Sequence, residues 1–194
     1  KKIGSIIGIV FSGLFPAHAQ FTQEDQAYID SLKFVVEYEK EDSVVLNAIL
    51  AWDDFIYAFD RELDYELNRR VVSIVQQGLN KPGVSDRYRK IYLRSYSIAQ
   101  NNLGLLLIDD EDFLSALKCF QLSLQIAEHY QDSMKIGNAL NNIGMIYDHL
   151  NLHEKAIEYY TKSHTYDKSD LVSTGSYYNN IGLCYMAMGD TMKA

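Results

Sequence analysis

The sequence predicts an all-α fold built as a solenoid of stacked antiparallel helix hairpins. The main evidence is a short phrase that occurs three times, as Asn101-Asn102-Leu103-Gly104, Asn141-Asn142-Ile143-Gly144 and Asn179-Asn180-Ile181-Gly182. Its glycines lie 40 and 38 residues apart (144−104 and 182−144). A period of about 20 to 50 residues is typical of a helical unit that buries its apolar face only by stacking on a neighbouring copy. Function is therefore expected on an extended surface.

The N-terminal 20 residues have the three parts of a secretory signal peptide. Lys1-Lys2 are followed by an apolar run of 13 residues from Ile3 to Phe15 (15−3+1), and Ala17-His18-Ala19 supplies an Ala-x-Ala cleavage site. This order predicts a signal peptide over residues 1–19 and export to the periplasm or the extracytoplasmic face of a membrane. The run is short for a bilayer span, which needs about 20 residues. An uncleaved signal that acts as an anchor stays an alternative.

Residues 20–80 are predicted to form an N-terminal cap helix and a degenerate helix hairpin. Apolar residues recur at helical spacing over residues 23–38, 43–58 and 61–78, and Lys81-Pro82-Gly83 then breaks the chain. The repeated phrase does not occur in this segment. Terminal repeats are usually atypical because one of their faces meets water.

Residues 81–194 are predicted to contain two repeats and a truncated third. Small residues on both helices of a hairpin allow a close crossing, and an aromatic ring fills the adjacent groove. Leucine at Gly144 should therefore overpack the crossing, whereas alanine should be milder. Ala194 stands barely one turn into a helix, so we expect the third repeat to be incomplete. The small residues follow each glycine by 12 positions, at Ala116, Ala156 and Ala194, and the aromatic residues follow four later, at Phe120 and Tyr160.

Turn-forming residues stand where the helices of each repeat should end. Asp109-Asp110, Asn151 and Gly189-Asp190 separate the two helices of successive repeats, and Asn and Gly suit a left-handed residue at a helix C-terminus. Asp132-Ser133 and Ser169-Asp170 can cap the helices that follow. Each hairpin is therefore expected to turn at these positions.

The pattern of small and aromatic residues resembles the tetratricopeptide repeat, in which an aromatic residue precedes Leu-Gly and Tyr, and Ala and Phe follow. The second repeat fits best, and the first is looser because Gln100 and Leu107 occupy the aromatic and tyrosine slots. The resemblance implies a right-handed superhelix that binds a protein or peptide in its concave groove. The residues in the family's slots are Gly104, Ala116 and Phe120, then Leu140, Ile143, Gly144, Tyr147, Ala156 and Tyr160, then Tyr178, Ile181, Gly182, Tyr185 and Ala194.

The asparagine pairs are the candidate binding residues. Asparagine inside a helix costs up to about 0.7 kcal/mol relative to alanine, so six of them in matched places require a compensating interaction. The resemblance implies that the residue two before each glycine faces the concave groove and hydrogen-bonds a ligand backbone. Alternatively, these side chains bond only to neighbouring helices or water. By the resemblance the binding residues are Asn102, Asn142 and Asn180, with Met145, Asp148, His149, Leu183 and Met186 as groove neighbours, and Asn101, Asn141 and Asn179 as inter-repeat or flank residues.

Several functions are not expected of this segment. A net charge of −8 without Lys/Arg clusters argues against nucleic-acid binding, and no motif of a catalytic site occurs. His149 and His153 stand four apart, but Asn151 should end the helix between them and a third ligand is not evident, so no metal is predicted. No cofactor is expected. Cys119 and Cys184 are expected to lie too far apart for a disulfide.

These features predict an extracytoplasmic module that binds a protein or peptide and is not an enzyme. The signal peptide, the weak leading hairpin and the repeats together resemble the periplasmic sensory regions of bacterial membrane-bound histidine kinases and helix-turn-helix regulators. That resemblance implies that a membrane helix and an output domain, such as a kinase, follow Ala194. Membrane contact is then expected only through those parts or an uncleaved signal. The alternative is a free periplasmic scaffold or assembly protein without signalling output.

Overall fold

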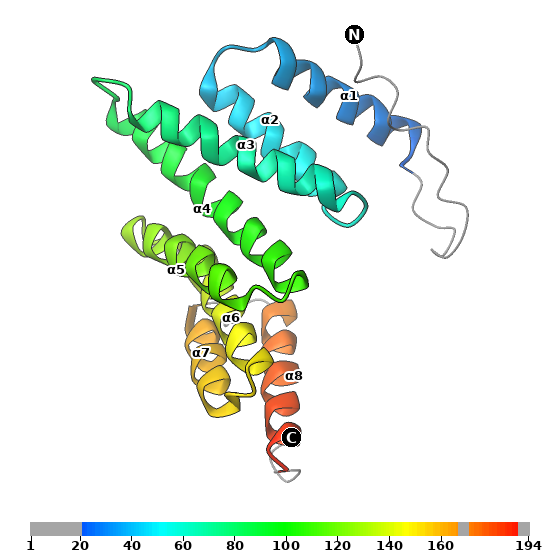
Figure 1. The fold of residues 1–194 in the computed structure, drawn as a ribbon, viewed down its shortest axis with the longest axis vertical. Helices are drawn as coiled ribbons and strands as arrows, with labels where there is room; N and C mark the ends of the chain where they lie inside the picture. Colours follow the sequence, from blue (N-terminus) through cyan, green and yellow to red (C-terminus); the bar gives the residue numbers. More distant parts are fainter. Residues whose placement is uncertain (1–20, 167–170, 190–194) are drawn as a thin grey trace.

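The computed structural model describes residues 21–166 and 171–189, which form eight α-helices and no β-strand (Figure 1). Successive helices pack against one another along the long axis, which confirms the all-α solenoid of helix hairpins. The predicted signal peptide, the Ser169-Asp170 cap and Ala194 lie outside the described residues. The helices are α1 (Gln23–Tyr38), α2 (Asp42–Ile56), α3 (Arg61–Leu79), α4 (Asp86–Asp109), α5 (Phe113–His129), α6 (Ser133–His149), α7 (His153–Tyr166) and α8 (Leu171–Ala187).

Local side-chain chemistry sets where the helices begin. Thr22 and Asp25 form a reciprocal capping box at the start of α1. The side chains of Asp60, Ser85, Asp112 and Asp132 each accept a hydrogen bond from a backbone N–H in the first turn of α3, α4, α5 and α6. Such a cap satisfies a donor that the helix itself leaves unpaired. The cap predicted at Asp132-Ser133 is therefore present at Asp132.

The same left-handed turn ends three successive helices. Glu111, Gln131 and Asn151 have φ values of 59°, 54° and 57° and follow α4, α5 and α6 at intervals of 20 residues (131−111 and 151−131). The prediction at Asn151 is therefore confirmed. After α4 the left-handed residue is Glu111, one position beyond the predicted Asp109-Asp110. At all three turns the N–H of the next residue donates to a carbonyl oxygen five positions earlier over 2.9 Å, and this bond helps to hold the left-handed residue in place.

The N-terminal helices share one continuous apolar core. Residues of α1, α2, α3 and α4 form it, and the polar residues Asp53 on α2 and Asp64 and Asn68 on α3 are buried as well. The repeats that follow have smaller apolar clusters between neighbouring helices. The buried residues of the large core are Ile29, Leu32, Val36, Val45, Leu46, Ala48, Ile49, Trp52, Ile56, Leu67, Val71, Val75, Tyr92 and Ala99.

The helices of each repeat cross where the glycine meets an aromatic ring. A Cβ atom on Gly104 would lie 2.5 Å from the ring of Phe120, and one on Gly144 would lie 2.8 Å from the ring of Tyr160. Ala156 contributes its carbonyl oxygen, 3.3 Å from the same Cβ position. Separations this short force neighbouring atoms to move. Alanine at Gly144 therefore also requires the Tyr160 ring to move. That alanine is milder than leucine at this position stays a prediction.

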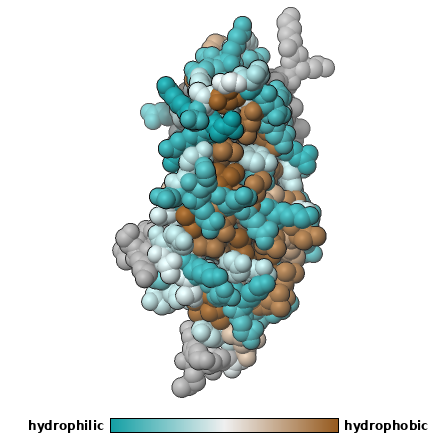
Figure 2. Space-filling model, turned by 90° about the vertical axis from the view of Figure 1, so that its left-hand side faces the viewer, coloured by the Kyte–Doolittle hydropathy of each residue, from teal (hydrophilic) through white to brown (hydrophobic). Residues whose placement is uncertain are grey.

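Hydrophobic side chains remain exposed along the length of the solenoid. Figure 2 shows one face, on which brown hydrophobic atoms extend along the middle and lower part with teal hydrophilic side chains across them. Among the helices of residues 21–166 and 171–189, none is both long enough and apolar enough to cross a membrane. Large exposed hydrophobic residues include Phe34, Tyr38, Tyr57, Leu114, Met134 and Tyr178.

Candidate functional site

The asparagine pairs join neighbouring repeats by side-chain hydrogen bonds, which we call the asparagine rungs. Asn142 on α6 donates from Nδ2 to Oδ1 of Asn101 on α4 over 2.9 Å. Asn180 on α8 donates in the same way to Asn141 on α6 over 3.2 Å. In both cases the donor stands two residues before its own glycine and the acceptor three residues before the previous one. The paired asparagines therefore set the same register at both junctions.

A carboxylate takes the acceptor position at the first rung. Asn102 on α4 donates from Nδ2 to Oδ2 of Asp53 on α2 over 2.8 Å. Asp53 is buried beside Asp64, and Nδ2 of Asn68 donates to Oδ1 of both carboxyl groups, over 2.9 and 2.7 Å. Burial raises the pKa of Asp53 to about 7, and the adjacent Asp64 carboxyl adds to the rise. This pair therefore retains a proton to a higher pH than an exposed aspartate does.

A groove with a volume of about 310 Å³ lies beside the rungs. Residues of α4, α6, α7 and α8 line it, so it sits where two repeats meet. Most of the lining side chains carry hydrogen-bonding groups, above all carboxamides from α4 and α6. A wall of this kind binds a ligand through directed polar contacts. The polar lining residues are Asn101, Asn138, Asn141, Asn142, Tyr160, Ser163, His164, Ser176 and Tyr177.

The lining of the groove includes a stacked aromatic pair, one ring of which carries an unsatisfied polar atom. The rings of His164 on α7 and Tyr177 on α8 are stacked, with centroids 4.2 Å apart and planes 9° apart. Within the described residues, Nδ1 of His164 is buried and has no hydrogen-bond partner. Ser163 donates to the carbonyl oxygen of Gly137 over 2.7 Å and holds α7 against α6. A buried polar atom is costly to leave unpaired, so a ligand group that reaches Nδ1 gains a hydrogen bond.

Of the residues predicted to bind a ligand, Asn142 is the one that lines this groove in the described part of the chain. Asn102 and Asn180 form the first and third rungs at neighbouring junctions. Leu183 and Met186 on α8 are exposed, and Met145 on α6 is half-buried. These three side chains lie outside the lining of the groove. Ligand contact at the rung residues and at these positions stays a prediction.

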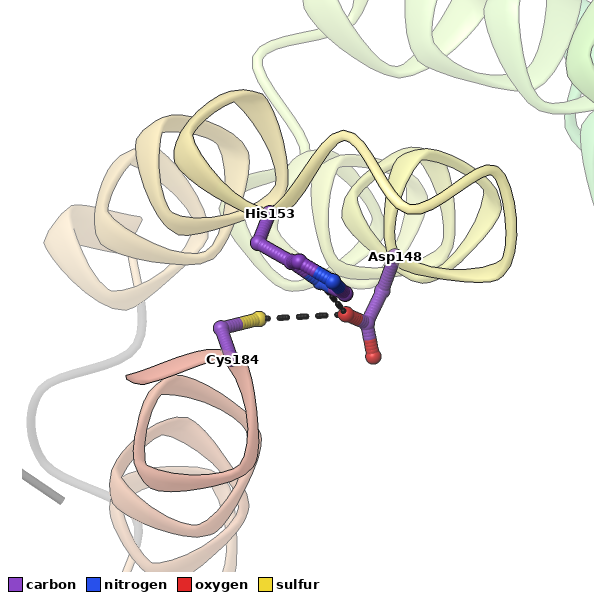
Figure 3. A group of neighbouring side chains, drawn as sticks. All are labelled: Asp148, His153 and Cys184. Carbon is purple, nitrogen blue, oxygen red and sulfur yellow. Dashed lines mark hydrogen bonds and ion pairs between the residues drawn. The ribbon is translucent and has the colours of Figure 1, made fainter. Parts of the chain in front are cut away.

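Asp148 and His149, also predicted as groove residues, face two other parts of the molecule. The His149 ring stacks on Phe113, with centroids 5.2 Å apart. Oδ1 of Asp148 is hydrogen-bonded to Nδ1 of His153 over 2.8 Å and accepts a bond from Sγ of Cys184 over 3.3 Å (Figure 3). His149 and His153 therefore do not act as a pair. Burial raises the pKa of Cys184 to about 12, and the bond to Asp148 adds to the rise.

Sequence reasoning missed most of the groove. The prediction that Asn101 and Asn141 lie between repeats agrees with the rungs, but both residues also line the groove. Asn138 carried a usable signal, because it stands three residues before Asn141 and four before Asn142, on the same helical face. His164 carried none, because its place depends on how the end of α7 packs beside α8.

The described geometry agrees with comparisons to known proteins. Residues 95–169 match the sequence profile of the tetratricopeptide repeat family. A crystal structure of MamA is similar with a TM-score of 0.57 and 17% sequence identity over 90% of each chain. A second crystal structure of MamA has a TM-score of 0.45 and 17% identity, over 87% of this chain and 84% of that one. At this identity the likeness shows the fold alone.

No curated protein matches the sequence. The family match covers the part of the chain that holds α5, α6 and α7 with most of α4, including the Gly104–Phe120 and Gly144–Tyr160 crossings. Tetratricopeptide repeats typically mediate interactions between proteins. Residues 95–169 are therefore similar to tetratricopeptide repeats, and they lie within a solenoid of helix hairpins that extends from α1 to α8.

Proposed function

We propose that this chain binds another protein or a peptide, and that an extended stretch of ligand backbone lies in the groove lined by Asn138, Asn141 and Asn142. The observation that carries the proposal is the cluster of carboxamides where two repeats meet. A carboxamide has two N–H donors and an oxygen acceptor. An asparagine that gives one N–H to a rung therefore retains groups for a peptide unit. Neutral amides bind a backbone without requiring a charged side chain.

The surroundings of the groove narrow the class of ligand. The stacked rings of His164 and Tyr177 offer an apolar surface together with the unpaired Nδ1. A peptide carries both apolar side chains and polar backbone groups. The net charge of −8 disfavours an acidic ligand. The proposed ligand is accordingly an extended segment of neutral or basic polypeptide, and no catalytic step is proposed.

The experiment for this proposal compares crosslinking at two exposed positions. A photo-crosslinking amino acid replaces Asn138, which lines the groove, or Lys118, which lies on α5 outside it. The full gene product is irradiated in cells, and the crosslinked species are identified by mass spectrometry. We expect one protein species that depends on the Asn138 position. Equal labelling from both positions, or none from Asn138, would contradict the proposal.

The proposed location is extracytoplasmic, and the proposed role is the sensory input of a membrane-bound signalling protein. Support comes from the basic, apolar and Ala-x-Ala order of residues 1–20 and from the resemblance to periplasmic sensory regions. Alkaline phosphatase fused after Gly189 tests the location, because this reporter is active only outside the cytoplasm. We expect activity that is lost when residues 1–20 are deleted. Equal phosphatase activity in the fusion that lacks residues 1–20, or no activity in either fusion, would contradict export.

A free extracytoplasmic scaffold is the second candidate, favoured because tetratricopeptide repeats typically mediate interactions between proteins. The two roles differ in what happens after binding. A sensory module changes the activity of a covalently linked output domain when its ligand is added, whereas a scaffold changes only which proteins associate. A transcriptional or phosphorylation readout with and without the crosslinked partner separates them.

A further inference from the structure

We propose that Asp148, His153 and Cys184 form a binding site for a zinc ion between α6, α7 and α8. Asp148 lies near the end of α6, His153 begins α7 and Cys184 lies on α8 (Figure 3). Their ligand atoms all lie within 4.8 Å of one another. The three side chains point toward a common position from three different helices. The site lies at the opposite end of α6 from Gly137 and the groove, so it goes beyond the proposed function.

The preceding junction of the solenoid shows that packing does not require these residue types. Asp148 and His153 stand four and nine residues after Gly144, and Cys184 stands two after Gly182. The residues at the same offsets from Gly104 and Gly144 pack together in one hydrophobic cluster. All three positions therefore change from apolar to metal-binding types between two equivalent junctions. The apolar residues at these offsets are Ile108, Phe113 and Ile146.

The donor set matches zinc. A carboxylate oxygen, an imidazole nitrogen and a thiolate sulfur are the three ligand types that Zn²⁺ takes in proteins, whereas Mg²⁺ and Ca²⁺ prefer oxygen alone. Bond lengths of about 2.0–2.3 Å place tetrahedral ligands ~3.3–3.8 Å apart. The observed separations are 2.8 Å between His153 and Asp148 and 3.3 Å between Cys184 and Asp148. The thiol separation already fits, and the imidazole must move away from Asp148 by less than about 1 Å.

Access and proton balance are also compatible with a metal. The Asp148 side chain is 32% exposed and that of His153 is 17% exposed, so an ion and one water molecule can reach the site from solvent. Cys184 is fully buried and would supply the ligand on the side of the site that faces away from solvent. When Zn²⁺ binds, the Cys184 thiol releases its proton to solvent and His153 binds through Nδ1 with its proton on Nε2. Water occupies the fourth position, as in zinc sites with three protein ligands.

Binding would tie three helices together. Helix α8 is held by packing on α7, by the third rung, which at 3.2 Å is the longest of the three, and by the hydrogen bond from Cys184 to Asp148. A zinc ion would replace that hydrogen bond with metal bonds from α8 to both α6 and α7. A ligand that binds the folded state alone raises its stability, so the ion would fix the position of α8 relative to the preceding hairpin.

Cobalt and zinc titrations of the metal-free protein test the site. Co²⁺ replaces Zn²⁺ in such sites and gives visible d–d bands and a near-ultraviolet thiolate charge-transfer band when it is tetrahedral with a cysteine ligand. We expect these bands in the wild-type protein at one equivalent of Co²⁺, and their loss when Zn²⁺ is added. A Co²⁺ spectrum of octahedral type, with no thiolate band, would overturn the proposal without any variant.

Matched variants identify the ligands. Cys184→Ser and His153→Phe should each weaken Zn²⁺ binding by at least about tenfold, measured by competition with a chromophoric chelator. Cys119→Ser and His149→Phe are the controls, because they remove the other cysteine and the neighbouring histidine. Equal weakening by the controls, or unchanged binding in Cys184→Ser, would overturn the assignment.

A triple variant tests the zinc site in a protein that is expected to fold normally. Asp148→Ile, His153→Phe and Cys184→Ile together copy the apolar residues of the preceding junction, so this variant should fold. We expect Zn²⁺ to raise the melting temperature of the wild-type protein and to leave that of the triple variant unchanged. An equal rise in both proteins would place the ion elsewhere and refute the site.

Discussion

Two equivalent junctions of this solenoid have the same backbone register and different chemistry. Between the α4–α5 hairpin and α6, three matched positions are apolar and belong to one hydrophobic cluster. Between the α6–α7 hairpin and α8, the same positions carry a carboxyl, an imidazole and a thiol. An asparagine rung spans each junction. The difference teaches that the rung recurs while the chemistry beside it changes, which leaves the neighbouring positions free to acquire another role.

The largest expected effect on stability comes from shortening a buried side chain at the apolar junction. Ile146 is fully buried there, and Cys184 is its equivalent at the polar junction. Ile146→Ala should lower the free energy of unfolding by about 2–5 kcal/mol, because it leaves a cavity. Cys184→Ala, measured in a chelator, should cost only about 1 kcal/mol through the lost hydrogen bond to Asp148. Equal costs in urea denaturation would show that both junctions depend on packing alone.

The second prediction concerns the glycine crossing, which is a feature that the successive repeats share. It tests how much stability depends on the absence of a Cβ atom at Gly144. Gly144→Ala should cost about 1–3 kcal/mol, because its Cβ meets the Tyr160 ring at 2.8 Å. Gly175→Ala on α8 is the matched control, since no atom lies within 4 Å of the added Cβ. The control should gain up to about 1 kcal/mol from helix propensity. A stabilising Gly144→Ala in thermal melts would mean that the ring moves aside without cost.

The first rung should respond to pH, unlike the amide rungs. The pKa of Asp53 is raised to about 7 in the folded protein from 3.8, so the folded state binds more protons than the unfolded state between these values. Its contribution is complete below pH 4 and is lost as the pH rises to about 7. Wild-type stability should therefore fall relative to that of Asp53→Asn over this range.

Denaturation of both proteins across the pH range measures that difference directly. Asp53→Asn keeps the shape and an acceptor oxygen for Asn102, and it converts the first rung to the amide type of the other two. Parallel pH profiles for the two proteins would show that the Asp53–Asp64 pair titrates like exposed carboxyl groups.

The smallest expected effect is the rung itself. A double-mutant cycle with Asn101→Ala and Asn142→Ala should give a coupling of about 0.5–1.5 kcal/mol. The cycle for Asn141 and Asn180 should give less, because that bond is 3.2 Å long instead of 2.9 Å. Single alanine variants regain part of the loss through helix propensity, so only the coupling reports the bond. Zero coupling at both junctions would leave the register to the glycine crossings.

The fold was largely readable from the sequence because its determinants are local and periodic. The repeated phrase located α4, α6 and α8, and apolar spacing located the helices over residues 23–38, 43–58 and 61–78 within a few residues of their observed bounds. The turn after α6 followed from Asn151 alone. Glu111 and Gln131 were not predictable, because neither residue type favours a left-handed conformation.

The candidate site was less predictable because it depends on contacts between helices. Asn142 stands at a groove position in the family pattern, but the partners of the asparagines are other asparagines about 40 residues away. Asp148, His153 and Cys184 have no short spacing that signals a metal, since Cys184 lies on a different hairpin. Their convergence follows only when the repeats are superimposed and equivalent positions are compared.

The direction of the rungs has a consequence for lengthening the protein. In every rung the donor belongs to the later helix and the acceptor to the earlier one. Asn179 stands three residues before Gly182, which is the acceptor position, and it is exposed on α8. A designed hairpin placed after α8 can therefore dock through a further asparagine rung, with Asn179 as the acceptor. Asp53, in contrast, is buried and already accepts hydrogen bonds from the amides of Asn68 and Asn102. The series of rungs therefore has a direction and can be extended only after α8.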